Sequence, residues 1–131
     1  MYSIILKRRC AVLCALLLFY FAPNLAAQAI LKFSDPKKNF GFVKQGKIVE
    51  LEFEFTNTGN QPLIISDYKV ECSCTSATFP SSPILPKQKG IVLVKFDTKT
   101  VYDRQDRIVE IISNASNSSE RIRFKGIVLK K

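Results

Sequence analysis

Two cysteines one residue apart are the chemically most unusual feature of this sequence. Cys72 and Cys74 lie at the end of an expected strand that starts at Leu63, and Thr75 follows them. Residues i and i+2 of an extended strand point to the same side, so the two thiols are expected side by side. Three interpretations stay open: small apolar side chains that fill the end of a core, a disulfide, or a soft-metal pair for Cu(I) or Zn(II). Two thiolates are too few for a closed zinc site.

The sequence contains few residues that could carry out other kinds of reaction chemistry. The sequence has no histidine, which excludes Ser-His-Asp and Cys-His catalysis and every imidazole metal site. Asp103 and Asp106 are close in sequence, but Arg104 and Arg107 stand beside them, which predicts a turn with local ion pairs rather than a catalytic pair. No glycine-rich phosphate loop is present. We therefore predict no catalytic residues, no cofactor and a protein that is not an enzyme.

The first residues have the pattern of an export leader. Residues 7–9 are basic, residues 10–22 form an uninterrupted apolar run, and small residues follow up to Ala29. The apolar run is shorter than the roughly 20 residues that a spanning helix needs. The sequence predicts a signal peptide over 1–29, cleaved after Ala29 or after Ala27, and one domain over 30–131. Membrane contact through this segment is expected only if it stays uncleaved.

The net charge of the chain limits the classes of partner that it can be expected to bind. Removal of the three leader cations lowers the formal charge from +9 to +6. A positive exported domain can meet anionic lipids, glycans or acidic proteins. The Lys and Arg residues are scattered in sequence rather than interleaved with aromatic residues, so we expect no nucleic acid. The expected partner is an unknown envelope protein or glycan, met in the periplasm or at the cell surface by a monomer or a weakly associated chain.

Period-two patterning dominates the chain after residue 30. Between Ile48 and Thr56, apolar side chains alternate with polar ones, which places Val49 and Phe53 on one face and Glu52 on the other. Leu63–Cys72 alternates less regularly, which predicts a bulge or a strand that changes sheets. The expected strands are 29–34, 40–43, 48–56, 63–72, 90–98, 107–113 and 121–129. Short strands separated by turn signals predict an all-β, immunoglobulin-like antiparallel sandwich of seven or eight strands.

Polar and proline-rich connections separate these strands. Asn57–Pro62 is expected to be a turn, since Asn and Gly tolerate positive φ. Thr75–Gln88 is predicted to be a loop, because three prolines exclude a central strand. Asn114–Ser119 reads as a further turn and contains two Asn-x-Ser sequons. The proline loop is a candidate binding site through Phe79, Pro80, Pro83 and Pro86.

The order of motifs resembles a known bacterial family, the domain of unknown function 1573. The residues that carry the resemblance are Phe53, Phe55, Asn57, Gly59, Pro62, Leu63, Ile65, Cys72, Cys74, Thr75, Pro86, Val94, Phe96, Asp97, Thr98, Ser113, Asn114, Lys125, Gly126 and Val128. The resemblance implies an exported immunoglobulin-like domain of the major-sperm-protein and Hydin type, for which no activity is agreed. Two departures stand out: Ser73 and Lys87 occupy positions where the family usually has Gly.

These observations favour a non-enzymatic binding or structural module of the bacterial cell envelope. Binding would use an exposed edge strand, as in strand addition, or the proline loop. One alternative is a thiol redox or copper-handling protein centred on Cys72 and Cys74. The other is a periplasmic chaperone-like subunit that pairs strands with a client.

Overall fold

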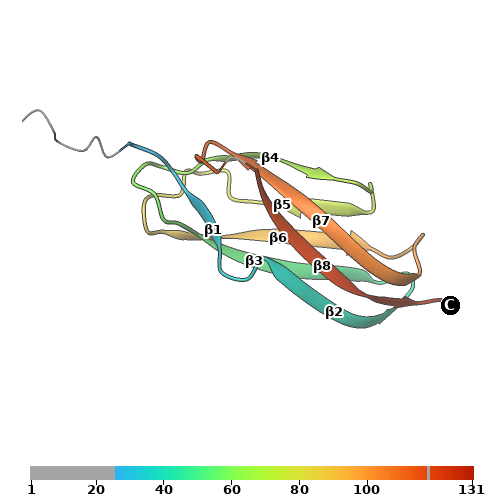
Figure 1. The fold of residues 1–131 in the computed structure, drawn as a ribbon. Coiled ribbons are helices and arrows are strands. Elements are labelled where there is room, and N and C mark those ends of the chain that lie inside the picture. The colour runs from blue at the N-terminus through green and yellow to red at the C-terminus, as the bar shows by residue number, and fades with distance from the viewer. Residues whose placement is uncertain (1–25, 118) are drawn as a thin grey trace, which may run out of the picture.

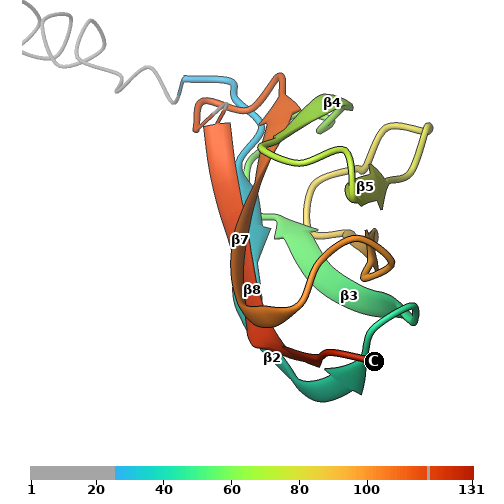
Figure 2. The same ribbon diagram turned by 90° about the vertical axis from the view of Figure 1, so that its right-hand side faces the viewer.

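The alternating segments become eight strands in two stacked sheets (Figure 1). The computed structural model describes residues 26–117 and 119–131, so the leader up to residue 25 lies outside the described residues. The first sheet has the order β1 (Leu31–Phe33), β3 (Ile48–Asn57), β6 (Lys89–Asp97), β5 (Thr75–Thr78). The second has the order β2 (Lys37–Lys44), β8 (Ser119–Leu129), β7 (Asp103–Ser113), β4 (Ile65–Val70). Figure 2 shows the two layers end-on. No helix in the described part of the chain is long and apolar enough to cross a membrane.

Aromatic side chains from both sheets fill the space between the layers. Phe53 and Phe96 from the first sheet and Phe124 from the second are fully buried. The ring centroids of Phe96 and Phe124 lie 5.3 Å apart, which joins β6 to β8 across the sandwich. Because Val49 is also buried and Glu52 is exposed, the faces predicted for the third strand are confirmed. The predicted all-β sandwich is confirmed as well, with eight strands, one of which lies in a segment that was expected to be a loop.

One strand pair departs from the predicted antiparallel arrangement. β2 runs parallel to β8, with Lys37 opposite Arg123 and Lys44 opposite Leu129. The chain leaves the first sheet after β1 and keeps its direction through Asp35 and Pro36 into the second sheet. The Pro36 carbonyl accepts from the Arg123 amide at 2.8 Å, which starts the new pairing. Local alternation does not encode such a change of sheet, so the sequence pattern missed it.

The turn expected at Asn57–Pro62 joins the two sheets, because β3 and β4 belong to different layers. Other boundaries differ from the sequence-based expectation. Residues 75–78 were expected in a loop but form β5, which pairs with β6 while the prolines remain outside the strand. β7 begins at Asp103 rather than at Arg107, within a segment expected to be a connection. The bulge predicted in the fourth strand is confirmed between Ile65 and Asp67.

Asn57 fastens the turn between the sheets to two other segments. Its side chain is fully buried. Its Oδ1 atom accepts from the amides of Gly59 at 3.0 Å and Ile30 at 3.3 Å. Its Nδ2 atom donates to the carbonyls of Gln61 at 2.7 Å and Ile84 at 2.9 Å. A buried amide must satisfy these groups, and Asn57 does so while it joins the start of the domain to the proline loop.

Candidate interaction surface

The two cysteines lie where the chain crosses from the second sheet to the first. Cys72 and Cys74 form a disulfide between the end of β4 and the start of β5. Both residues are half-buried, and Cys74 packs against the core. The Cys74 carbonyl accepts from the Asp97 amide at 2.8 Å, which ties the bonded pair to β6. The described residues contain no group of three His, Cys, Asp or Glu side chains that could hold a metal ion.

Part of the proline loop packs against the body of the domain and is not free to contact a partner. The Phe79 ring lies 6.5 Å from that of Tyr68, in an edge-to-face arrangement, and packs against the core. Pro80 is half-buried, whereas Pro83 and Pro86 are exposed. Of the four candidate binding residues in this loop, only the last two therefore offer a free surface.

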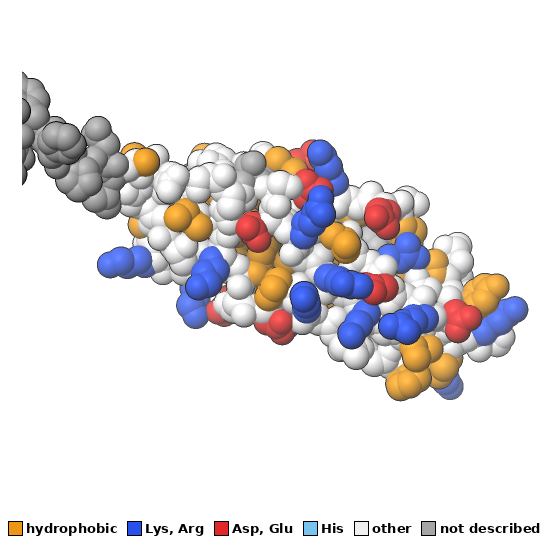
Figure 3. All heavy atoms as spheres, in the orientation of Figure 1, with side chains coloured by type: hydrophobic (Ala, Val, Ile, Leu, Met, Phe, Trp, Pro, Cys, Tyr) orange, Lys and Arg blue, Asp and Glu red, His pale blue; other side chains and the backbone are white. Residues whose placement is uncertain are grey.

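The outer face of the second sheet gathers a large share of the cations. Strand register and exposure place seven Lys and Arg side chains on this face, against the acidic residues Asp67, Asp106 and Glu110. Figure 3 shows Lys and Arg side chains spread over this side of the molecule, with apolar side chains between them. We call this surface the basic face; its cations are Lys37, Lys44, Lys69, Arg104, Arg121, Arg123 and Lys125, and its apolar members are Phe42, Ile108, Ile127 and Leu129.

The outer face of the first sheet is close to neutral. It carries four acidic residues, Glu50, Glu52, Glu54 and Asp97, and three lysines, Lys32, Lys89 and Lys95. Two of the lysines are paired: Lys89 with Glu54 at 3.0 Å and Lys95 with Glu50 at 3.3 Å. The hydrogen bond from Lys89 lowers the pKa of Glu54 below its ordinary value. The two outer faces of the domain therefore differ strongly in charge.

Two carboxylates neutralise only part of the basic face. Arg123 donates to Asp106 through Nε at 2.6 Å and through a terminal nitrogen, which lowers the pKa of Asp106 and raises that of Arg123. The Ser119 hydroxyl donates to Glu110 and lowers the pKa of that carboxyl. Among residues 26–117 and 119–131, Lys37, Lys44, Arg104 and Lys125 form no ion pair.

The local ion pairs predicted around Asp106 are wrong. Its partner is Arg123 on the neighbouring strand, because Asp106 lies in β7 rather than in a turn. Arg107 turns toward the interior and donates to the Gln105 side chain at 2.8 Å. The acidic residue and the nearby arginine therefore point to opposite sides of the sheet, as successive strand residues do.

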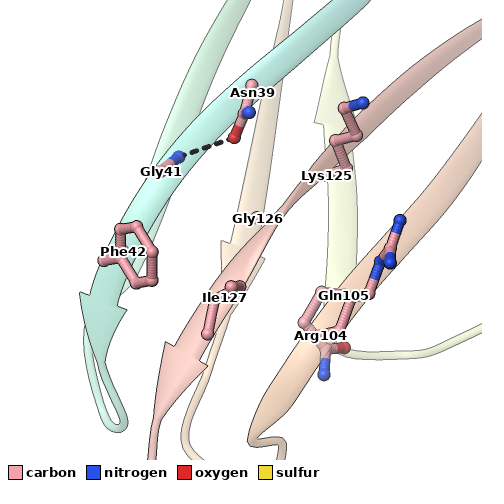
Figure 4. A pocket seen from close by; sticks show the side chains of 8 residues that line it. All are labelled: Asn39, Gly41, Phe42, Arg104, Gln105, Lys125, Gly126 and Ile127. Atoms are coloured by element: carbon pink, nitrogen blue, oxygen red, sulfur yellow. Dashed lines mark hydrogen bonds between the residues drawn. The ribbon is translucent and has the colours of Figure 1, made fainter.

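A hollow in the basic face combines apolar walls with a cationic rim (Figure 4). Its floor is the backbone of Gly41 on β2 and Gly126 on β8, which are paired across the strands. Phe42, Ile127 and the side chains of Arg104 and Lys125 complete a volume of about 280 Å³. A second hollow of about 290 Å³ adjoins it and shares Asn39, Arg104 and Lys125 with it. This surface can hold an anionic group beside an apolar one.

The sequence pattern found some of these residues and missed others. The outward positions of Arg121, Arg123 and Lys125 follow from the alternation within the expected strand 121–129, and all three side chains are exposed. Phe42 was missed because it shares parity with Phe40, which packs inward on Phe96 at 5.9 Å. The bulge between Asn39 and Gly41 breaks that parity and leaves Phe42 71% exposed. The signal available in the sequence was a glycine, Gly41, inside an apolar segment. In the structure this residue has a φ of 72°.

Comparison with known proteins supports the architecture. No curated protein matches the sequence. A protein of unknown function from Porphyromonas gingivalis is similar in structure, with a TM-score of 0.69 and 18% identity over 82% of this chain and 50% of that chain. The chain thus spans about half the length of that protein. A PapD-like domain of human CEP192 has a TM-score of 0.62 and 10% identity over 84% of this chain and 93% of that domain.

A third similar structure is the VesB protease of Vibrio cholerae, with a TM-score of 0.56 and 19% identity over 77% of this chain and 31% of that chain. At these identities the likeness shows the fold alone, a PapD-like, immunoglobulin-like sandwich. The sequence itself matches one family model, the protein of unknown function DUF1573, over residues 31–128. The chain therefore belongs to the DUF1573 family.

Proposed function

We propose that this chain is an exported, non-catalytic binding module of the bacterial cell envelope and that the basic face is its recognition surface. The observation that carries the proposal is the inequality of the two outer faces: seven cations against three acidic residues on one, three against four on the other. Such an imbalance on one flat surface attracts anionic partners and speeds their encounter. Export rests on the leader pattern of the first 29 residues.

The edges of the sheets favour binding through the face rather than through strand addition. β1 and β5, which end the first sheet, have three and four residues. β2 and β4, which end the second sheet, both carry a bulge, near Gly41 and between Ile65 and Asp67, and β2 also has lysines at Lys37, Lys38 and Lys44. Short edges, lysines and bulges are the devices by which proteins prevent strand pairing with another chain. These features oppose a chaperone-like role in which a client adds a strand.

Site-specific photo-crosslinking in native envelopes tests the proposal. A photoreactive side chain replaces Lys125 on the basic face, and a matched variant carries it at Lys95, which is also an exposed strand lysine but lies on the other sheet. Adducts with an envelope component are expected from position 125 and not from position 95. Equal crosslinking from both positions, or none from position 125, would exclude the basic face as the recognition surface.

A thiol–disulfide role is the second candidate, supported by the bonded and half-buried Cys72–Cys74 pair. The disulfide has no thiolate to offer a copper ion, so metal binding would require its reduction first. The double variant Cys72→Ser, Cys74→Ser separates the two candidates. A binding module keeps its partner in this variant, whereas a redox protein loses every thiol-dependent activity. Thiol titration of the purified native protein gives the oxidation state directly.

A further inference from the structure

We propose that the partner of the basic face is an anionic phospholipid bilayer, against which the second sheet lies flat. This inference rests on the proposed function and names the partner class of the same surface. It is carried by three features of the face: the direction of its cations, the apolar side chains at one end, and the hollow between them.

The cations of the basic face point in one direction. Outward side chains stand roughly perpendicular to a sheet, so residues of neighbouring strands that share a face can meet one plane together. Lys37, Lys125 and Arg104 lie on β2, β8 and β7, and none of them forms an ion pair within the described residues. A membrane rich in phosphate headgroups is a plane of negative charge that such a surface complements.

Exposed apolar side chains lie at the end of this face where the chain terminates (Figure 3). Phe42 is 71% exposed, Tyr102 is 52% exposed and Leu129 is 46% exposed. Lysines accompany them: Lys44 is paired in register with Leu129, and the Lys130 ammonium lies 5.0 Å from the centre of the Tyr102 ring. Aromatic and aliphatic groups enter the headgroup–acyl boundary, while lysine stems extend so that their charges stay among the phosphates.

The combination of unpaired cations, exposed apolar side chains and the hollow favours a bilayer over other anionic partners. A soluble acidic glycan would engage the cations but leave Phe42 in water. The hollow beside Phe42 has a floor of bare backbone at Gly41 and Gly126, so it can receive an acyl or glycerol segment next to the phosphate that Arg104 or Lys125 holds. Unpaired cations beside exposed apolar groups match the layered chemistry of a membrane surface, which is charged above and apolar below.

Vesicle binding of the exported protein, in the processed form that cells produce, tests this inference. Co-sedimentation is measured with vesicles of phosphatidylglycerol and phosphatidylcholine and with phosphatidylcholine alone. The face variant is Lys44→Gln, Arg104→Gln, Lys125→Gln. The control variant, with the same net charge, is Lys32→Gln, Lys89→Gln, Lys95→Gln on the first sheet. Any leader that remains is common to both variants, so their comparison stays valid.

We expect the protein to bind the anionic vesicles, more weakly as salt is added. Each cation removed from the face should weaken binding about fivefold, hence roughly a hundredfold for the face variant, while the control variant stays close to the parent. Phe42→Ser should lower the affinity about tenfold, and Ile91→Ser, on the first sheet, should not.

Equal binding by the face and control variants, or no preference for anionic vesicles, would overturn the inference. The crosslinking experiment then tests the proposed function separately from the membrane inference. Adducts from position 125 with a protein or glycan, together with absent vesicle binding, would retain the basic face as a recognition surface and exclude the membrane as its partner. If the protein neither binds anionic vesicles nor gives adducts from position 125, the proposed function is excluded as well.

Discussion

The side-chain amide of Asn117 exchanges two hydrogen bonds with the backbone of Leu31, although 86 residues separate the two. Oδ1 accepts from the Leu31 amide at 3.1 Å, and Nδ2 donates to the Leu31 carbonyl at 2.7 Å. The side chain thus takes the place of a neighbouring strand at the free edge of β1. Because Nδ2 is engaged and the residue is half-buried, a glycan on this sequon is incompatible with the fold.

We expect Asn117→Ala to destabilise the domain by about 1–3 kcal/mol, the usual cost of leaving such groups without a partner. Chemical denaturation monitored by fluorescence or circular dichroism measures the change. Ser116→Ala, at an exposed position of the same turn, is the control and should stay within about 0.5 kcal/mol. Equal effects of the two substitutions would show that the bonds to Leu31 do not stabilise the fold.

The alternation of β3 predicts unequal effects of neighbouring substitutions. Phe53 is fully buried, and Phe53→Ala should cost about 3–5 kcal/mol because a large cavity remains in the core. Glu52 is exposed, and Glu52→Ala should change the free energy of unfolding by no more than about 0.5 kcal/mol. Thermal and urea unfolding of the two variants gives both values. A similar loss at both positions would contradict the packing of the first sheet.

The bond from Arg123 to Asp106 predicts a pH dependence. The pKa of Asp106 is lowered in the fold, chiefly by this hydrogen bond, so the folded state binds its proton less readily than the unfolded chain. The resulting stabilisation is present above the unfolded pKa of about 3.9 and is lost as the pH falls through the lower folded pKa. Asp106→Asn should therefore flatten the stability profile in this acid range. An unchanged slope would mean that the pair contributes nothing in solution.

Lys87 has a φ of 67°, a conformation that favours glycine. The turn is held there because the Lys87 amide donates to the Asn57 carbonyl at 2.8 Å. The residue therefore adopts a left-handed conformation despite its side chain. We expect Lys87→Gly to stabilise the domain by about 0.5–1 kcal/mol, since relief of strain exceeds the added chain entropy. A lower unfolding temperature for Lys87→Gly than for the parent would contradict the inference that the backbone at Lys87 is strained.

Residues before β1 already belong to the domain, which bears on the cleavage position. Ala29 is buried, and its carbonyl accepts from the Ser116 amide at 3.0 Å. Gln28 exchanges hydrogen bonds with Asn60 at 2.7 and 2.9 Å. Cleavage after Ala29 would remove these contacts, whereas cleavage after Ala27 preserves them. We therefore expect the exported protein to begin at Gln28, which intact-mass measurement checks. A mass corresponding to a start at Ile30 would contradict this expectation.

The fold was predictable from the sequence wherever the alternation within one strand is enough to show which of its side chains are buried. Val49, Phe53 and Phe124 alternate with charged neighbours, and burial of alternate side chains is a local property of one strand. The parallel pairing of β2 with β8 is not local. It depends on which sheet the chain enters after Pro36, and no alternation pattern carries that information.

The basic face was predictable only in part for the same reason. The outward direction of Lys125 follows from its own strand, but its position beside Asn39 and Asp106 follows from strand order. The ion pair of Asp106 was wrongly assigned because its partner is 17 residues away along the chain and adjacent only through β-pairing. Charges that are scattered in sequence thus gather on one side of the folded domain.

The parallel pairing of β2 and β8 has a mechanical consequence. The described chain enters the domain at one end of the sandwich and leaves it at the other (Figure 1). Both strands run toward the same end, so tension between the termini pulls β2 backward and β8 forward along their common length. Their hydrogen bonds, from Lys37 opposite Arg123 to Lys44 opposite Leu129, are then loaded in shear and must break together. This arrangement resists stretching far better than a hairpin that unzips one bond at a time.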